Sequence, residues 1–91
     1  MSYEVRLRRT AEKGLDAIPR RDYERIARAL AVLEEHPRPP GAKKLADTAL
    51  LRVRVGQYRI VYAVDDEAQV VTIVRVARRQ EDTYRDRKSV V

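Results

Sequence analysis

The sequence predicts a single α+β domain, spanning residues 1–91, in which helices pack on one face of a sheet. Three observations predict this fold. Side chains alternate between apolar and charged near the N-terminus and again from Leu51 to Arg79, which is the period of strands with one buried face. Between these segments, apolar side chains recur at helical spacing. A chain of 91 residues is long enough for one small domain with one core.

The first elements are a strand and a short helix. Residues 3–8 alternate in character and predict the first strand. Thr10 is suited to cap the helix that follows. The apolar side chains of this helix are Ala11, Leu15 and Ile18. Pro19 then interrupts the helical pattern.

A second, longer helix follows Pro19, so the two helices form a hairpin. Its predicted apolar stripe consists of Tyr23, Ile26, Ala27, Leu30 and Leu33. The helix should end near Glu35, because Pro37 and the prolines after it cannot continue it. Residues 37–45, which include Lys43 and Lys44, are predicted to form a loop.

Three consecutive antiparallel strands complete the prediction, so one mixed sheet carries the helices on one face. Gly56-Gln57 predicts a two-residue hairpin turn, which sets Arg54 opposite Arg59. The side chains predicted to face the core from the first two strands are Val53, Val55, Tyr58, Ile60, Tyr62 and Val64. Tyr3 is also expected in the core.

The second turn, at residues 65–67, sets the register of the last strand. It would pair Val64 with Val70 and therefore place Arg59 opposite Arg75. Val71 and Ile73 would then lie on the arginine side of the sheet. A register slip of one residue would instead move every side chain of this strand to the opposite face. The acidic residues of the turn itself are expected to have no further role.

Composition excludes several classes of function. The chain has no cysteine and one histidine, His36, so we expect neither a disulfide nor a metal site, and we expect no cofactor. It contains no apolar run long enough to span a bilayer, and its first residues do not resemble a signal peptide. We therefore expect a cytoplasmic protein.

The charge of the chain indicates an anionic partner. The net charge is +6, and 16 arginines accompany 4 lysines. A genome rich in G and C would raise the number of arginines, but it would not decide where they lie. Arginine binds phosphate through two parallel hydrogen bonds and stacks on bases, so this balance favours nucleic acid or an acidic protein as the partner.

The predicted strands gather arginines on one face of the sheet. These residues are Arg52, Arg54, Arg59, Arg75 and Arg79. Like charges directly opposite each other destabilise a strand pair by roughly 0.2–1 kcal/mol. A solvated face that protects the sheet from aggregation is the alternative interpretation, but acidic residues would serve that purpose equally well, and the strand interiors contain none. The pattern therefore favours an anion-binding site.

The same segments resemble the RelE/ParE superfamily of bacterial type II toxins. The resemblance rests on residues 52–62, the turn at Asp65-Asp66, residues 75–79, and Tyr84-Arg85. The strand, helical hairpin and proline-rich break before them also fit, so the likeness covers nearly the whole chain. The Tyr-Arg-Ile-Val-Tyr strand at residues 58–62 is typical of the superfamily but is shared by its different branches.

The resemblance implies a function and assigns residues to it. The RelE branch cleaves messenger RNA, usually on the ribosome and without a metal, by attack of the ribose 2′-OH on the adjacent phosphate. The catalytic residues would be Arg59, which stabilises the phosphate, Arg79, which aids the leaving group, and Tyr84, which packs on the base or activates the 2′-OH. The expected substrate-binding residues are Arg52, Arg54, Arg75 and Arg78.

Two other functions remain open from the sequence. A ParE-type toxin would inhibit DNA gyrase without catalysis, and an inert or regulatory member would act only within an antitoxin complex. In each case we expect a cognate antitoxin whose acidic segment covers the basic face. Operator DNA would be bound only through that antitoxin, and no membrane partner is expected.

Overall fold

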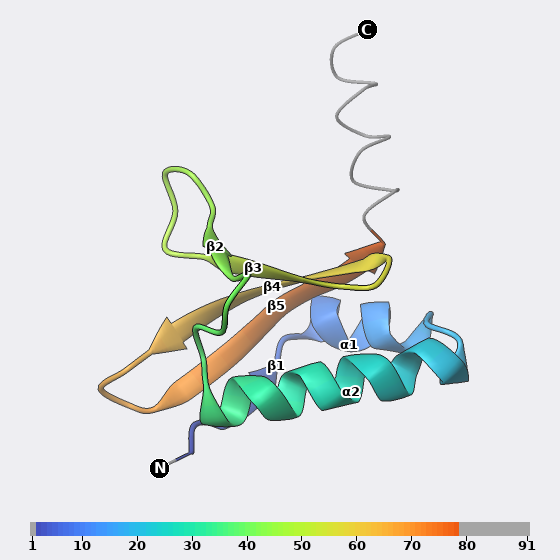
Figure 1. Cartoon of the computed structure of the whole chain (residues 1–91), viewed down its shortest axis with the longest axis horizontal. Coiled ribbons are helices and arrows are strands. Elements are labelled where there is room, and N and C mark those ends of the chain that lie inside the picture. The colour runs from blue at the N-terminus through green and yellow to red at the C-terminus, as the bar shows by residue number, and fades with distance from the viewer. Residues whose placement is uncertain (1, 79–91) are drawn as a thin grey trace, which may run out of the picture.

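The computed structural model describes residues 2–78, and the chain forms two helices and a five-stranded mixed sheet (Figure 1). The elements are β1 (Glu4–Leu7), α1 (Arg9–Asp16), α2 (Arg20–Glu35), β2 (Lys43–Lys44), β3 (Leu51–Val55), β4 (Tyr58–Asp65) and β5 (Val70–Arg78). The strand order is β1-β5-β4-β3-β2, and β1 pairs with β5 in parallel while the other pairs are antiparallel. The predicted α+β class is confirmed. Lys43-Lys44, predicted to lie in a loop, instead forms the edge strand β2.

The core lies between the sheet and the two helices, which cover the same face of it (Figure 1). Tyr58 and Tyr62 are buried as predicted, whereas Tyr3 is only half-buried at the margin of the core. The other buried side chains are Ala11, Leu15, Ile26, Leu33, Ile60, Val71, Ile73 and Val76. Among the described residues, neither helix is long and apolar enough to cross a bilayer.

Helix α1 packs closely on β5 through two small residues. The predicted cap at Thr10 is wrong, because the helix begins at Arg9, with Arg8 at the cap position, and Thr10 lies inside its first turn. Its hydroxyl instead donates a hydrogen bond to the carbonyl oxygen of Val74 in β5. Gly14 faces the same strand, where a Cβ atom would overlap the carbonyl oxygen of Val76. The absence of a side chain at Gly14 therefore allows the close approach of helix and strand.

Helix α2 ends at Glu35, as the prolines predicted. Its buried face differs from the predicted stripe, because Ile26 and Leu33 are buried while Tyr23 and Ala27 are exposed. The packed face also includes Ala29 and Leu30. The sequence spacing alone does not determine the rotation of a helix about its axis against the sheet, so the predicted stripe lies partly on the exposed side of α2.

The turn between β4 and β5 is shorter than predicted. Val70 lies opposite Asp65 rather than Val64, which leaves a turn of four residues at 66–69. Asp65 both ends the strand and closes the turn, because its Oδ1 accepts a hydrogen bond from the backbone N–H of Ala68 at 3.1 Å. The predicted register is therefore wrong by one residue at this end of the sheet.

A bulge in β5 changes the alternation farther along the strand. Val71 and Ile73 face the helices and are fully buried, so their predicted place on the arginine side is wrong. The pairing then shifts between Val61 and Tyr62, and Val74 is the extra residue on β5. Because a bulge interrupts the alternation, the next buried residue after Ile73 is Val76. Arg75, which precedes Val76, therefore stays on the outer face.

A polar network holds the turn end of the sheet. The Arg38 guanidinium donates to both carboxylate oxygens of Asp66, at 3.1 and 3.0 Å, and the Tyr3 hydroxyl donates to the same carboxylate at 2.8 Å. The Arg38 guanidinium, followed by the Tyr3 hydroxyl, holds the pKa of Asp66 below its usual value. Asp66 was predicted to have no role beyond the turn, but it connects the N-terminus, the segment after α2 and the β4–β5 turn.

Candidate nucleic-acid interface

The sheet face opposite the helices carries cations in two neighbouring rows that run across the strands. The first row contains Lys43, Arg52, Val61 and Arg75, taken from β2 to β5. The second row contains Arg54, Arg59 and Ala77. Residues directly opposite each other in a sheet share a face, so the five charged residues of these rows lie together. We refer to these five residues as the cationic face.

The pairing within the rows places like charges side by side. Lys43 lies opposite Arg52, and Arg54 lies opposite Arg59, whereas neither row contains an acidic residue. The hairpin turn causes the pairing of Arg54 with Arg59. Gly56 has a φ of +59°, and the two-residue turn sets the residues on either side of it directly opposite each other. The shared face predicted for Arg52, Arg54, Arg59 and Arg75 therefore agrees with the structure.

One predicted contact within this face is wrong. Arg59 lies opposite Ala77, and Arg75 lies opposite Val61 in the neighbouring row. The bulge and the shorter turn shift β5 along β4 while they keep Arg75 on the outer face. Arg54 is exposed, and Arg52, Arg59 and Arg75 are half-buried. Arg54, Arg59 and Arg75 also interact with neighbouring groups, so the fold constrains these side chains.

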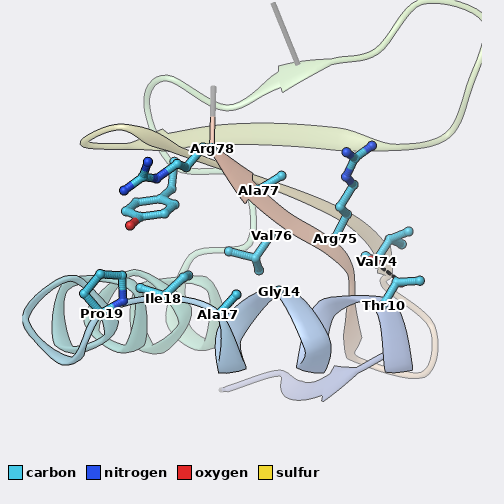
Figure 2. Close-up of a pocket in the computed structure, with 11 residues that line it drawn as sticks. Thr10, Gly14, Ala17, Ile18, Pro19, Val74, Arg75, Val76, Ala77 and Arg78 are labelled. Carbon is cyan, nitrogen blue, oxygen red and sulfur yellow. Dashed lines mark hydrogen bonds between the residues drawn. The ribbon is translucent and has the colours of Figure 1, made fainter. Parts of the chain in front are cut away.

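The remaining predicted site residues are not part of this face. Arg78 lies opposite Tyr58, on the helix side of β5. It borders a groove of about 600 Å³ between α1 and the last residues of β5. Figure 2 shows Arg75 and Arg78 leaving the strand in different directions. The predicted catalytic residues Arg79 and Tyr84 lie outside the described residues.

Two hydrogen bonds on the helix side of the sheet hold β4, the strand that carries Arg59. Tyr58 is a buried neighbour of Arg59, and its hydroxyl donates to Oδ2 of Asp22 in α2 at 2.9 Å. The Tyr62 hydroxyl donates to the carbonyl oxygen of Pro37 at 2.7 Å, and burial raises the pKa of Tyr62. These bonds tie β4 to α2 at Asp22 and to the segment after α2 at Pro37, so the stretch of β4 that carries Arg59 is held at both ends.

Lys43 is the cation of this face that the sequence did not predict. A strand of two residues has no alternation from which a face could be assigned, and the surrounding prolines and glycine indicate a loop. Only the pairing with β3 shows that Lys43 and Arg52 belong together. In the part of the chain that the structure describes, no group of three or more potential ligands gathers to hold a metal ion.

Comparison with known proteins identifies similar chains and folds. The family model described as the ParE toxin of the type II toxin-antitoxin system parDE matches residues 5–83. Toxin RelG of Mycobacterium tuberculosis is 36% identical over 89 residues, which cover 93% of this chain and 99% of that protein. A chain from the RelBE2 toxin-antitoxin complex of M. tuberculosis matches with a TM-score of 0.78 and 32% identity, covering 87% of this chain and 100% of the other.

A more distant source gives the same fold. A chain of the archaeal RelE-RelB complex from Pyrococcus horikoshii superposes with a TM-score of 0.77 and is 30% identical. The match covers 87% of this chain and 97% of the archaeal one.

Proposed function

Because this chain belongs to the RelE/ParE superfamily and is a type II toxin, we propose that it kills or arrests the cell by cutting messenger RNA. In this proposal it is a metal-independent endoribonuclease that acts on ribosome-bound mRNA. The observation that carries the proposal is the cationic face, in which Arg54 stands directly opposite Arg59 with no acid in either row. A fold selected for stability alone gains nothing from this arrangement.

The proposed reaction is an internal transesterification of the RNA backbone. The ribose 2′-oxygen attacks the adjacent phosphorus while a base accepts its proton. The bond from phosphorus to the 5′-oxygen breaks, and that oxygen receives a proton. The products are a 2′,3′-cyclic phosphate and a 5′-OH. The phosphorane that forms on the way carries extra negative charge, and fixed donors aimed at that charge lower the barrier.

Arg59 is the residue to which we assign this charge stabilisation. It is half-buried between Arg54 and Ala77, on a strand whose two tyrosine hydroxyls bond to Asp22 of α2 and to Pro37 after that helix. A guanidinium held in this way presents donors in a fixed plane, which suits two phosphate oxygens. Arg52, Arg54 and Arg75 would bind the flanking backbone.

Two further roles come from the family resemblance. Tyr84 would accept the 2′-OH proton or pack on the base, and Arg79 would act at the leaving oxygen. A free tyrosine has a pKa near ~10, so it needs neighbouring cations to favour the phenolate. Arginine stays protonated in proteins, so we expect Arg79 to contribute charge rather than a proton.

The proposal includes a cognate antitoxin and cytoplasmic action. Similar solved chains were crystallised in toxin-antitoxin complexes named for RelB partners. A partner segment rich in acids would neutralise the cationic face, and a segment that folds on binding can cover a large surface. We infer that operator DNA is reached only through that partner.

The test is primer extension on cellular mRNA after induction of this chain without its antitoxin. New cuts inside translated frames are expected with the unchanged chain. Arg59→Ala should lower the rate of cutting by about 10²–10³-fold, the usual cost of removing one charge-stabilising donor. Lys13→Ala removes an exposed charge from α1, on the other side of the sheet, and should cut normally. Undiminished cutting by Arg59→Ala would refute the proposed site.

Inhibition of DNA gyrase without catalysis is the second candidate. It is favoured by the matching family model, whose description names the ParE toxin. Growth arrest with uncut mRNA and an induced DNA-damage response would support this candidate over the first. Both measurements can be made on the same induced cultures.

A further inference from the structure

A small hollow lies beside the cationic face, at the edge of the sheet. It has a volume of about 210 Å³ and is lined by Pro40, Gly41, Lys43, Arg52, Val53 and Arg54. Three of these six residues are cations, and they come from two different strands. The resemblance gives Arg52 and Arg54 a general role in substrate binding, but it assigns no role to Lys43 or to the hollow that the three cations share.

The local sequence explains why a hollow forms here. Strand β2 pairs with β3 only through its two residues, so the chain before Lys43 is not held against β3. Pro39 and Pro40 have no backbone N–H with which to extend the ladder. Gly41 has a φ of +94°, and an added Cβ atom would meet nothing within 4 Å. The segment thus turns away from β3 and leaves a gap over Val53.

The size and lining of the hollow fit a phosphate group. Its volume corresponds to about seven water molecules, which is smaller than the pockets of roughly 300–1,000 Å³ that hold drug-sized organic ligands. Lys43 lies directly opposite Arg52, and Arg54 follows on the same face of β3. A lysine ammonium and two guanidiniums around a small space can bind one compact anion from several sides.

We propose that this hollow is a second phosphate subsite, in which Lys43 and Arg52 bind the RNA phosphate next to the one that is cleaved. The inference rests on the proposed function, because it assigns a neighbour to the phosphate at Arg59. Strands lie about 4.8 Å apart, so β2 lies about 10 Å from β4 across the sheet. A subsite at this distance holds the same strand of RNA at a second point and fixes the direction in which it crosses the sheet.

The chain supplies a matched control for this subsite. Lys44 is adjacent to Lys43 in the same strand, but it lies opposite Leu51, so alternation directs it to the other side of the sheet. Lys43→Ala and Lys44→Ala change the net charge equally. A general effect of charge on RNA affinity would therefore be the same in both variants, whereas a subsite would respond only to Lys43.

The experiment measures binding of short 2′-O-methyl RNA oligonucleotides, which cannot be cleaved, to the full chain. Lys43→Ala should weaken binding about five- to tenfold and reduce the salt slope, d(log K)/d(log[salt]), by about 0.7. Lys43→Arg should restore both quantities, and Lys44→Ala should leave both close to the unchanged chain. Circular dichroism verifies that each variant is folded.

Neutral linkages locate the subsite along the RNA. One methylphosphonate at a time is placed along the oligonucleotide, and the loss of affinity is measured for the unchanged chain, for Lys43→Ala and for Arg59→Ala. The linkage whose neutralisation removes the effect of Lys43→Ala should lie next to the linkage that removes the effect of Arg59→Ala.

Three outcomes would overturn the subsite: equal losses for Lys43→Ala and Lys44→Ala, an effect of Lys43 spread over all linkages, or no binding of any oligonucleotide. The proposed function fails separately, when Arg59→Ala still cuts mRNA in cells. If the unchanged chain cuts mRNA, but Lys43→Ala and Lys44→Ala weaken RNA binding equally, the proposed function stands and the proposed subsite is refuted.

Discussion

The two faces of the same sheet follow opposite rules. On the helix side, Ile60, Tyr62 and Ile73 have no exposed surface, and the buried tyrosine hydroxyls of β4 each have a hydrogen-bond acceptor. On the outer side, Lys43 faces Arg52 and Arg54 faces Arg59. Because alternate residues of one strand serve the two faces, stability and polyanion binding are assigned to neighbouring positions. Substitutions should therefore separate the two properties at a spacing of one residue.

The largest effect on stability is expected from the helix side. Ile73→Ala should lower the free energy of unfolding by about 2–5 kcal/mol, because it removes a fully buried side chain and leaves a cavity. Val61→Ala, in the outer row between Arg52 and Arg75, should cost clearly less, since Val61 is only half-buried. Urea unfolding of both variants gives the measurement. Equal losses would contradict the division between the faces.

A smaller loss is expected where α1 meets β5. Gly14→Ala would normally favour a helix by up to about 1 kcal/mol. Here the new methyl group would overlap the carbonyl oxygen of Val76, so we expect a net decrease of about 1–3 kcal/mol in the free energy of unfolding. Glu12→Ala, at an exposed position of the same helix, should not destabilise the fold to this extent in the same urea titration. A more stable Gly14→Ala variant would show that the contact does not limit the packing of α1.

The outer face should respond in the opposite direction. Arg52→Gln removes a like charge opposite Lys43 and should raise the free energy of unfolding by roughly 0.2–1 kcal/mol at low ionic strength. The gain should shrink in salt, which screens exposed charges, while RNA binding should weaken. Lys44→Gln, opposite Leu51, serves as the control and should show little change. A lower free energy of unfolding in Arg52→Gln would show instead that the Arg52 side chain stabilises the fold.

The smallest effect is expected at the turn end of the sheet, as a dependence on pH. The guanidinium of Arg38 and the hydroxyl of Tyr3 lower the pKa of Asp66, so the folded state favours the carboxylate. This stabilisation is fully present above the unfolded pKa of about 3.9 and is lost as the pH falls through the lower folded value. Asp66→Asn should therefore show a flatter decline of Tm below about pH 4. An unchanged decline would assign the acid sensitivity to other carboxylates.

The sequence predicted the strands and helices because their periods are local properties. The hairpin at Gly56, the end of α2 and the shared face of Arg52, Arg54, Arg59 and Arg75 follow from turn chemistry and alternation, and they agree with the structure. The β5 register could not be predicted in the same way. A bulge is an interruption of alternation, and the Thr10 bond to Val74 that accompanies it joins residues 64 positions apart. Lys43 was missed because β2 has only two residues and exists through its pairing with β3.

The two ends of the sheet also differ in the sign of the charges that their side chains carry. Asp65, Asp66 and Glu67 cluster at the β4–β5 turn, near the acidic end of α2, whereas Arg54 and Arg59 lie six strand positions away, beside the opposite hairpin. Six residues of strand span roughly 20 Å. Within the described sheet, this arrangement separates positive from negative charge along the strands. In the field of a polyanion such a separation would favour an approach in which the hairpin end leads and the acidic turn trails.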